Sequence, residues 1–112
     1  MESKAELKYI QLTARKARQV ADTLRTKPVD QALFFLAGMK NKKKAIEPME
    51  KTLKSAVANF AVAHPSVDTE KLFIKQIFVN EGPTQKRIRA RAQGRAMRRL
   101  KRSCHLTIVI SD

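Results

Sequence analysis

Nine cationic side chains lie between Lys86 and Arg102, in a stretch of seventeen residues that contains no acid. Seven of the nine are arginines, whose planar guanidinium groups suit bidentate contact with phosphate and stacking on bases. The cations are Lys86, Arg87, Arg89, Arg91, Arg95, Arg98, Arg99, Lys101 and Arg102. A cluster of this kind indicates binding to a polyanion.

The net charge of the whole chain also indicates binding to a polyanion. The chain has 112 residues, with 24 Lys and Arg against 10 Asp and Glu, for a net charge of +14. Without the nine clustered cations, 15 basic and 10 acidic residues leave +5 on the rest of the chain. The polyanion is RNA, DNA or an anionic membrane. Three readings of the cluster stay open at this stage: an ordered binding element, a disordered loop that touches nucleic acid loosely, and a solvated insertion.

The sequence shows no pattern of residues that would form a catalytic or metal-binding site. Cys104 and His105 are adjacent, so on a strand they point to opposite faces and cannot act as nucleophile and base. His64 precedes Pro65 and is expected in a loop. The single cysteine excludes an internal disulfide and suits a reducing compartment. No ligand spacing for zinc and no phosphate-binding glycine pattern occurs. We therefore expect no enzyme, no metal site and no cofactor.

The first part of the chain predicts a strand followed by a helix. Residues 4–12 favour a strand, and Thr13 is a plausible helix N-cap. Apolar residues then recur at helical spacing over 14–26, which predicts an amphipathic helix. The expected buried positions are Ala14, Ala17, Val20, Ala21 and Leu24. Arg15, Lys16 and Arg18 either offer a second cationic contact from this helix or form an ordinary solvated face. Asp22 is placed to pair with Arg18.

Two further helices are expected in the middle of the chain. One follows Pro28, with Gly38 at its end and a stripe of Val29, Ala32, Leu33 and Leu36. After a loop at 40–44, the next begins near Ala45. Its apolar stripe is Ile46, Met49, Leu53, Val57 and Phe60, with Glu47–Lys51 and Glu50–Lys54 as stabilising pairs. Further core residues are Phe34, Phe35 and Met39.

Strands are expected at 71–80 and 105–111, on the two sides of the cationic stretch. Three helices and three strands without βαβ alternation predict an α+β fold, with the helices packed on a small three-stranded antiparallel sheet. The two strands can pair directly only if the chain between them returns, which predicts a long basic β-hairpin with its turn near Gly94. At about 3.3 Å per residue, an arm of roughly twelve residues reaches about 40 Å.

Three stretches resemble a known family. VNEGPTQKRIRARAQGRAMRRLKRSCHLTIVIS at 79–111, ARKARQVADTLRTKPVDQAL at 14–33 and EKTLKSAVANF at 50–60 are similar, in order and spacing, to the bacterial-type large-subunit ribosomal protein L-twenty-two family. The resemblance covers nearly the whole chain. It implies one domain with a globular body (1–79 and 106–112) and an extended hairpin arm (80–105).

The resemblance also implies a function. The family binds large-subunit (23S-type) ribosomal RNA, contacts neighbouring ribosomal proteins and supports subunit assembly in the cytoplasm. Its hairpin lines the nascent-peptide exit tunnel, so a nascent polypeptide is expected to pass the tip. Carried onto this chain, the tip is Ala90, Arg91, Ala92, Gln93, Gly94 and Arg95.

Two other classes stay open. A DNA-binding protein could place the arm in a groove, and a cationic module could lie on a membrane surface. The arm lacks the broad apolar face that interfacial anchoring requires, and no run of 18 apolar residues predicts a spanning helix. The start of the chain, MESKAELKYIQ, predicts no export signal. We expect neither a membrane partner nor a homo-oligomer.

Overall fold

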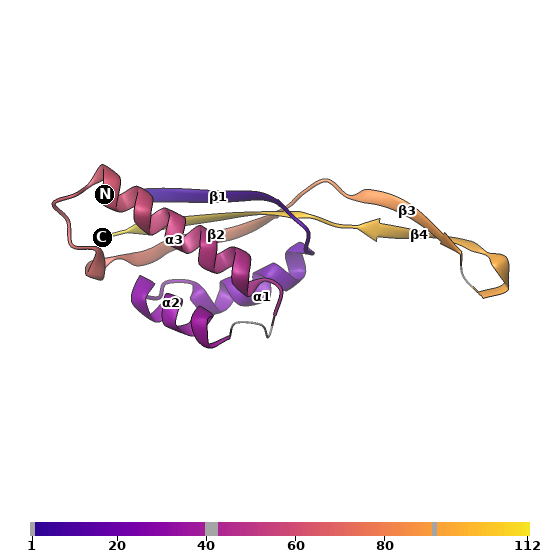
Figure 1. Cartoon of the computed structure of the whole chain (residues 1–112), viewed down its shortest axis with the longest axis horizontal. Helices are drawn as coiled ribbons and strands as arrows, with labels where there is room; N and C mark the ends of the chain where they lie inside the picture. Colours follow the sequence, from indigo (N-terminus) through magenta and orange to yellow (C-terminus); the bar gives the residue numbers. More distant parts are fainter. Residues whose placement is uncertain (1, 40–42, 91) are drawn as a thin grey trace.

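The computed structural model describes residues 2–39, 43–90 and 92–112. It is an α+β fold in which α1 and α3 pack on one face of an antiparallel sheet, α2 packs against α3 on the same side, and a two-stranded arm extends from one end (Figure 1). Within the described residues the chain runs in this order: β1 (Glu2–Ile10), α1 (Ala14–Leu24), α2 (Val29–Gly38), α3 (Ile46–Ala63), a 3₁₀ turn (Thr69–Lys71), β2 (Phe73–Glu81), β3 (Gln85–Ala90), a second 3₁₀ turn (Ala92–Gly94), β4 (Ala96–Lys101) and β5 (Cys104–Ser111). The predicted fold class is confirmed.

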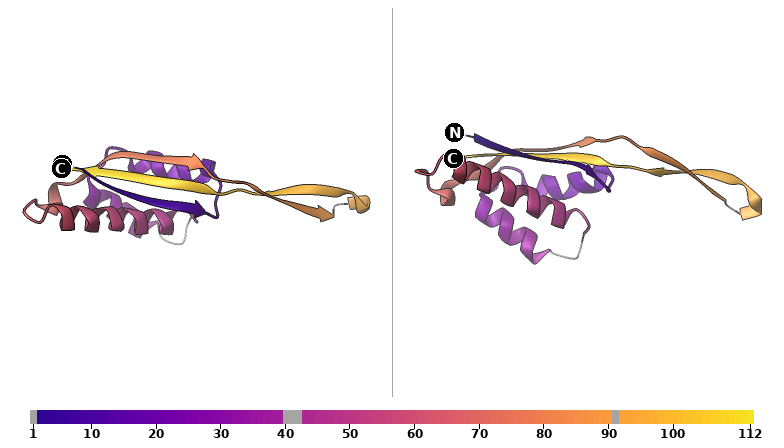
Figure 2. Two further views of the ribbon diagram at one scale, coloured as in Figure 1. Left: turned by 90° about the horizontal axis from the view of Figure 1, so that it is seen from above. Right: turned by 45° about the horizontal axis from the view of Figure 1, so that its top comes forward.

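The body sheet has the strand order β1-β5-β2, with both outer strands antiparallel to β5. The views in Figure 2 show its three strands as one layer with the helices behind it. The central strand is the most buried, since Leu106, Ile108 and Ile110 are fully inaccessible and even Thr107 on the other face is buried. The C-terminal strand, which leads directly out of the arm, is thus held on both edges.

The predicted helix stripes form the core between sheet and helices. All five expected positions of α1 are buried, as are Val29, Ala32 and Leu36 of α2 and the α3 residues Ile46, Met49, Leu53 and Phe60. Val57 and Leu33 are only partly buried. Thr13 caps α1 as expected, its Oγ1 accepting a hydrogen bond from the Lys16 backbone N–H at 3.4 Å. Helical periodicity therefore identified most of this core.

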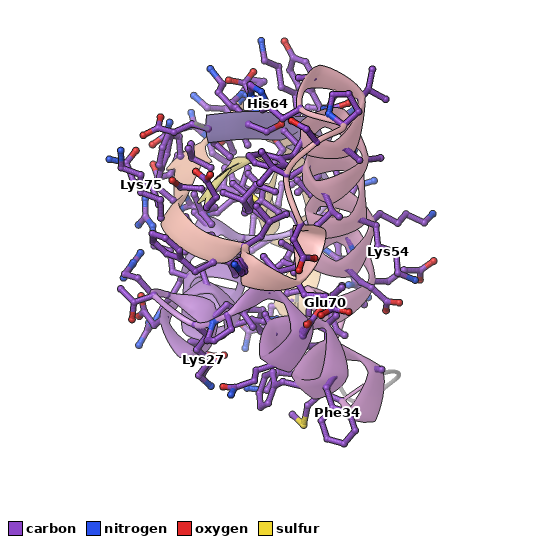
Figure 3. The ribbon with its side chains drawn as sticks, turned by 90° about the vertical axis from the view of Figure 1, so that its left-hand side faces the viewer. Lys27, Phe34, Lys54, His64, Glu70 and Lys75 are labelled. Atoms are coloured by element: carbon purple, nitrogen blue, oxygen red, sulfur yellow. The ribbon has the colours of Figure 1, made fainter. Side chains whose placement is uncertain are left out.

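Phe34 is a correction. It was expected in the core, but it lies on the outer side of α2 with 83% of its surface exposed, and Figure 3 shows it pointing away from the body. Its neighbour Phe35 packs partly against the core instead. Consecutive helical residues lie about 100° apart, so only one of two adjacent phenylalanines can point fully inward.

Several element boundaries also differ from the expectation. The first strand ends at Ile10 rather than residue 12, because the ladder with β5 shifts between Leu7 and Ile10 and Tyr9 adopts a left-handed φ of 59°. Helix α1 ends at Leu24 rather than residue 26, since Arg25 is extended and Thr26 has a φ of 65°. The strand expected at 71–80 is β2, which spans Phe73–Glu81. The expected loop at 40–44 falls largely on residues outside the described ranges.

The α1 arginines have a role that the sequence pattern did not show. Asp22 pairs with Arg25 at 2.7 Å, not with Arg18 as predicted. Arg18 donates from Nε and Nη2 to the Val79 carbonyl at 3.1 and 2.9 Å, and Arg25 donates from Nη2 to the Ile77 carbonyl at 2.9 Å. Because β2 is an edge strand, its outward carbonyls lack a strand partner, and these guanidinium groups satisfy two of them.

Candidate RNA interface

The arm is a separate two-stranded sheet of β3 and β4. Its register pairs Gln85 with Lys101 at the base and Ala90 with Ala96 near the tip. Every residue of both strands is exposed, and the molecule measures 65 Å along its longest axis against 25 Å along the next. A two-stranded ribbon with no hydrophobic covering is marginal in water. The arm therefore has no protein layer of its own to stabilise it within the described residues.

Most predicted arm cations lie on these two strands. Lys86, Arg87 and Arg89 are on β3, while Arg98, Arg99 and Lys101 are on β4. Arg102 follows β4 directly, and Arg95 lies between the tip turn and β4. Arg91 lies outside the described residues. Arg87 stands directly opposite Arg99 in the register, a pairing of like charges that destabilises a ladder unless an anion lies between them.

The tip turn has two consecutive residues in the left-handed region, Gln93 at φ 62° and Gly94 at φ 72°. The glycine was predicted and adopts this conformation freely. The left-handed conformation of Gln93 was not predicted. For a residue other than glycine this backbone conformation costs about 1 kcal/mol or more. Ala90, Ala92 and Arg95 complete the described part of the tip, and all of these residues are exposed. Three of the described tip residues, Ala90, Ala92 and Gly94, have small side chains or none.

Where the arm leaves the body, the chain is closely packed. The Gly82 N–H donates to the Ser103 carbonyl at 2.9 Å, and the Ser103 hydroxyl donates to the Pro83 carbonyl at 2.7 Å. His105 accepts a hydrogen bond at Nδ1 from the Tyr9 backbone N–H at 3.0 Å, and its ring meets the Tyr9 ring edge-on. His105 therefore packs at the arm root. Cys104, its neighbour, is fully buried, so the two point apart as expected.

The first turn of α1 lies beside this root. Ala14 and Arg102 line the same small hollow, together with Glu81, Gly82, Thr84 and Ser103. Arg15 and Lys16, both exposed, are in that first turn, where no acid is present. The N-terminal end of a helix carries a partial positive charge. Together with the side chains of Arg15 and Lys16, this charge makes the start of α1 a place that favours anions. The predicted body contact thus adjoins the arm.

Two body cations were missed from the sequence. Lys43 and Lys44 line, with Lys16, Leu12 and Gln19, a concavity of about 340 Å³ that has no acidic residue in its lining. The lysine run was interpreted only as a loop, because its approach to the start of α1 depends on tertiary packing. Arg18, which was expected to bind a partner, already gives two donors to the Val79 carbonyl, although its side chain stays exposed.

The described part of the chain brings together no group of metal-ligating side chains. Among residues 2–39, 43–90 and 92–112, no three His, Cys, Asp or Glu side chains come together as metal ligands. His64 ends α3 and stacks its ring against Phe60 at 5.0 Å. None of the described helices is both long and apolar enough to cross a membrane. What these residues bring together is a cationic surface running from the arm to the start of α1.

Comparison with known proteins gives a consistent result. The family described as "Ribosomal protein L22p/L17e" matches residues 5–111. Proteins named "Large ribosomal subunit protein uL22" are similar over the whole of this chain. The one from Mesoplasma florum is 53% identical with 97% of its length covered, and that from Mycoplasma capricolum is 52% identical with 98% covered. The one from Syntrophus aciditrophicus is 46% identical, with 99% covered.

Proposed function

The chain belongs to the ribosomal protein L22p/L17e family, and from this membership we propose that its arm binds large-subunit ribosomal RNA. The coarser role follows from the family: a structural, ribosome-associated protein of the large subunit. The finer statements below are proposals, supported by the geometry of the arm and its root.

One observation carries the RNA proposal. The arm projects a ribbon of cations with no acid between Glu81 and Asp112, and it has no protein layer of its own on either face. Like charges face each other across it, as at Arg87 and Arg99. Such an element is stable only where phosphates neutralise it and release their counterions. Folded ribosomal RNA supplies phosphates on several sides of a thin ribbon at once.

The proposed contact continues onto the body. From Arg102 at the root it passes to Arg15 and Lys16 in the first turn of α1, and then to Lys43 and Lys44 across the concavity. Arg18 belongs to this set as well, although its Nε and Nη2 already donate to the Val79 carbonyl. We keep the division into a body (1–79 and 106–112) and an arm (80–105) as part of the proposal. An RNA bound to both would hold the arm in one direction, which is how the protein would support subunit assembly.

The RNA proposal is tested by sedimentation. Tagged wild-type chain, an arm variant with the nine cations between 86 and 102 changed to glutamine, and a body control, Lys51→Gln with Lys54→Gln, are expressed separately and run on high-salt sucrose gradients. We expect wild type and control to travel with large subunits and the arm variant to be lost or to accumulate in immature particles. An arm variant that sediments with mature subunits as wild type does would refute the proposal. In binding to purified large-subunit RNA, the nine arm cations should contribute no more than about 6 to the magnitude of the logarithmic salt slope, at roughly 0.7 per cation.

We also propose that the tip faces a nascent polypeptide in the exit tunnel. The only cysteine of the chain, Cys104, is fully buried, so Gln93→Cys introduces one accessible thiol. A thiol-specific cross-linker on Gln93→Cys should capture nascent chains in translating ribosomes. Val62→Cys, on the exposed side of α3, is the matched control, since Val62 is 84% exposed on the body. Equal capture by the two variants would count against the tip position.

A further inference from the structure

The register of the arm gives it two chemically different faces. In an antiparallel pair, directly opposite residues lie on the same face, and the next residue along each strand lies on the other. Lys86 pairs with Leu100, Ile88 with Arg98, and Arg87 with Arg99. One face, which we call the apolar face, carries Lys86, Ile88, Ala90, Ala96, Arg98 and Leu100. The other, the arginine face, carries Gln85, Arg87, Arg89, Met97, Arg99 and Lys101.

The faces differ in charge. Four of the six described strand cations lie on the arginine face and two on the apolar face. The apolar face has the two branched aliphatic side chains of the ribbon, Ile88 and Leu100, which are 79% and 42% exposed. Their partners across the ladder are cations, so the two apolar side chains are diagonal neighbours that share one patch. The arginine face has only Met97 as a large apolar residue.

We propose, on the basis of the proposed function above, that the two faces bind different parts of the RNA. The arginine face contacts phosphates, while Ile88 and Leu100 pack against exposed base or ribose surfaces, with Lys86 and Arg98 reaching the phosphates beside them. The arm can then fit its RNA site in only one orientation about its long axis. Both faces contribute to the affinity. The difference in charge and apolar content between the two faces determines how the arm is rotated about its long axis within the RNA.

Charge complementarity identifies RNA as the occupant of the apolar face. Ile88 stands directly opposite Arg98, and Leu100 opposite Lys86, so whatever covers the apolar side chains also meets two cations. Neither strand supplies an acid to neutralise them. A nucleic acid presents apolar base faces and anionic phosphates within one nucleotide of each other. An aliphatic protein surface would leave both cations unpaired.

The two modes of contact predict different salt behaviour. Each phosphate contact contributes about 0.7 to 0.9 to the logarithmic salt slope, whereas burial of apolar surface contributes none. Changing Arg87 and Arg99 to glutamine should therefore reduce the slope by about 1.4 to 1.8. Changing Ile88 and Leu100 to serine should weaken binding by about tenfold at every salt concentration and leave the slope within about 0.5 of wild type. Loss of apolar burial should also make the heat-capacity change on binding less negative.

The experiment titrates full-length chain against purified large-subunit ribosomal RNA between about 50 and 400 mM KCl, the range over which phosphate-dominated binding changes most. Four chains are compared: wild type, Arg87→Gln with Arg99→Gln, Ile88→Ser with Leu100→Ser, and the control Phe34→Ser with Val62→Ser. The control makes the same kind of change at exposed apolar residues of the body. It should bind as wild type does. All substituted positions are exposed, and circular dichroism of each chain verifies that the body is folded.

The outcomes separate the two proposals. If wild type itself shows no salt-dependent preference for this RNA over duplex DNA, the proposed function fails. If wild type binds but the Ile88/Leu100 variant matches it, or loses slope instead of affinity, the two-faced arm is wrong and the RNA function stands. If that variant binds purified RNA normally but leaves subunits at high salt, a neighbouring protein covers the apolar face, which also overturns the inference. A parallel tenfold loss at unchanged slope supports it.

Discussion

Gly82 at the arm root provides a sharp test of the packing described above. A Cβ at this position would lie 2.6 Å from the Ser103 Oγ and 3.1 Å from the His105 Cε1. The Ser103 hydroxyl is held there because it donates to the Pro83 carbonyl at 2.7 Å. In the variant Gly82→Ala the new methyl group must therefore displace this hydroxyl and press against the imidazole ring.

The expected cost follows from these contacts. Rotating the Ser103 hydroxyl away breaks one hydrogen bond, worth about 0.5 to 1.5 kcal/mol. The His105 ring must also give by a few tenths of an ångström, although its Nδ1 is tied to the Tyr9 N–H at 3.0 Å. Inserting a methyl into a packed site costs typically about 1 to 3 kcal/mol. Because the nearest obstruction is a hydroxyl that can rotate, we expect Gly82→Ala to lower the free energy of unfolding by about 1 to 2 kcal/mol.

A double-mutant cycle tests the cause as well as the size. Urea unfolding is followed by far-ultraviolet circular dichroism for wild type, Gly82→Ala, Ser103→Ala and the double variant; the chain has no tryptophan to report by fluorescence. Ser103→Ala alone should cost about 0.5 to 1 kcal/mol through the lost hydrogen bond. Adding Gly82→Ala to it should then cost about 0.5 to 1 kcal/mol less than it does in wild type, because only the contact with the His105 ring remains. An equal cost of Gly82→Ala in both backgrounds would refute the role given to the hydroxyl.

Three further predictions concern the body. Phe60→Ala should cost about 3 to 5 kcal/mol in urea unfolding, because the ring is fully buried, whereas Phe34→Ala should stay within about 0.5 kcal/mol of wild type. Thr13→Ala should cost about 0.5 to 1 kcal/mol and Thr13→Ser should recover most of it, since either hydroxyl can accept from the exposed N–H at the start of α1. Burial raises the pKa of the Cys104 thiol above its usual value of 9.0. The unfolded chain therefore loses this proton first as pH rises, so the free energy of unfolding should fall above about pH 9, and less so in Cys104→Ala. The thiol should also react slowly with a disulfide reagent at pH 8 until urea is added.

The helices and the body strands could be predicted because their signals are local. Ala17 and Leu24 in α1, and Ile46 and Phe60 in α3, belong to apolar series with helical spacing. Such spacing predicts a helix face that packs against a core. The Glu47–Lys51 pair is local as well, and the structure places its charged atoms 3.7 Å apart. Signals within one or two turns of a helix do not depend on the rest of the fold.

The errors occur where a distant segment decides the outcome. Arg18 was expected to pair with Asp22 one turn along α1, but its guanidinium donates instead to the carbonyl of Val79 on the outer edge of β2. Phe34 was expected inside because it is aromatic, yet the orientation of α2 admits only Phe35 toward the core. Tyr9 lies in a bulge whose position is set by pairing with β5. Helical spacing allows only one of Phe34 and Phe35 to point inward, but it carries no information on the acceptor of Arg18 or on the bulge at Tyr9.

The candidate site divides in the same way. The charge of the arm is visible in the sequence, since nine cations without an acid require no fold to be recognised. The division of that charge between two faces follows only from the register of β3 with β4. The approach of Lys43 and Lys44 to Lys16 depends on packing between the starts of α3 and α1. Composition therefore predicts the kind of partner, and structure is needed to predict how the partner is held.

The arm and the body sheet are two halves of one hairpin with different sources of stability. The β2–β5 ladder reaches Glu81 and Cys104, the Gly82–Ser103 hydrogen bond continues it, and β3 with β4 extends it outward. The inner half is covered by three helices and has β1 as a third strand; the outer half has neither. The outer half is connected directly to β5, which is the central and most buried strand of the body sheet. Binding along the arm therefore need order only the outer ribbon, since the root that directs it is already fixed by the fold.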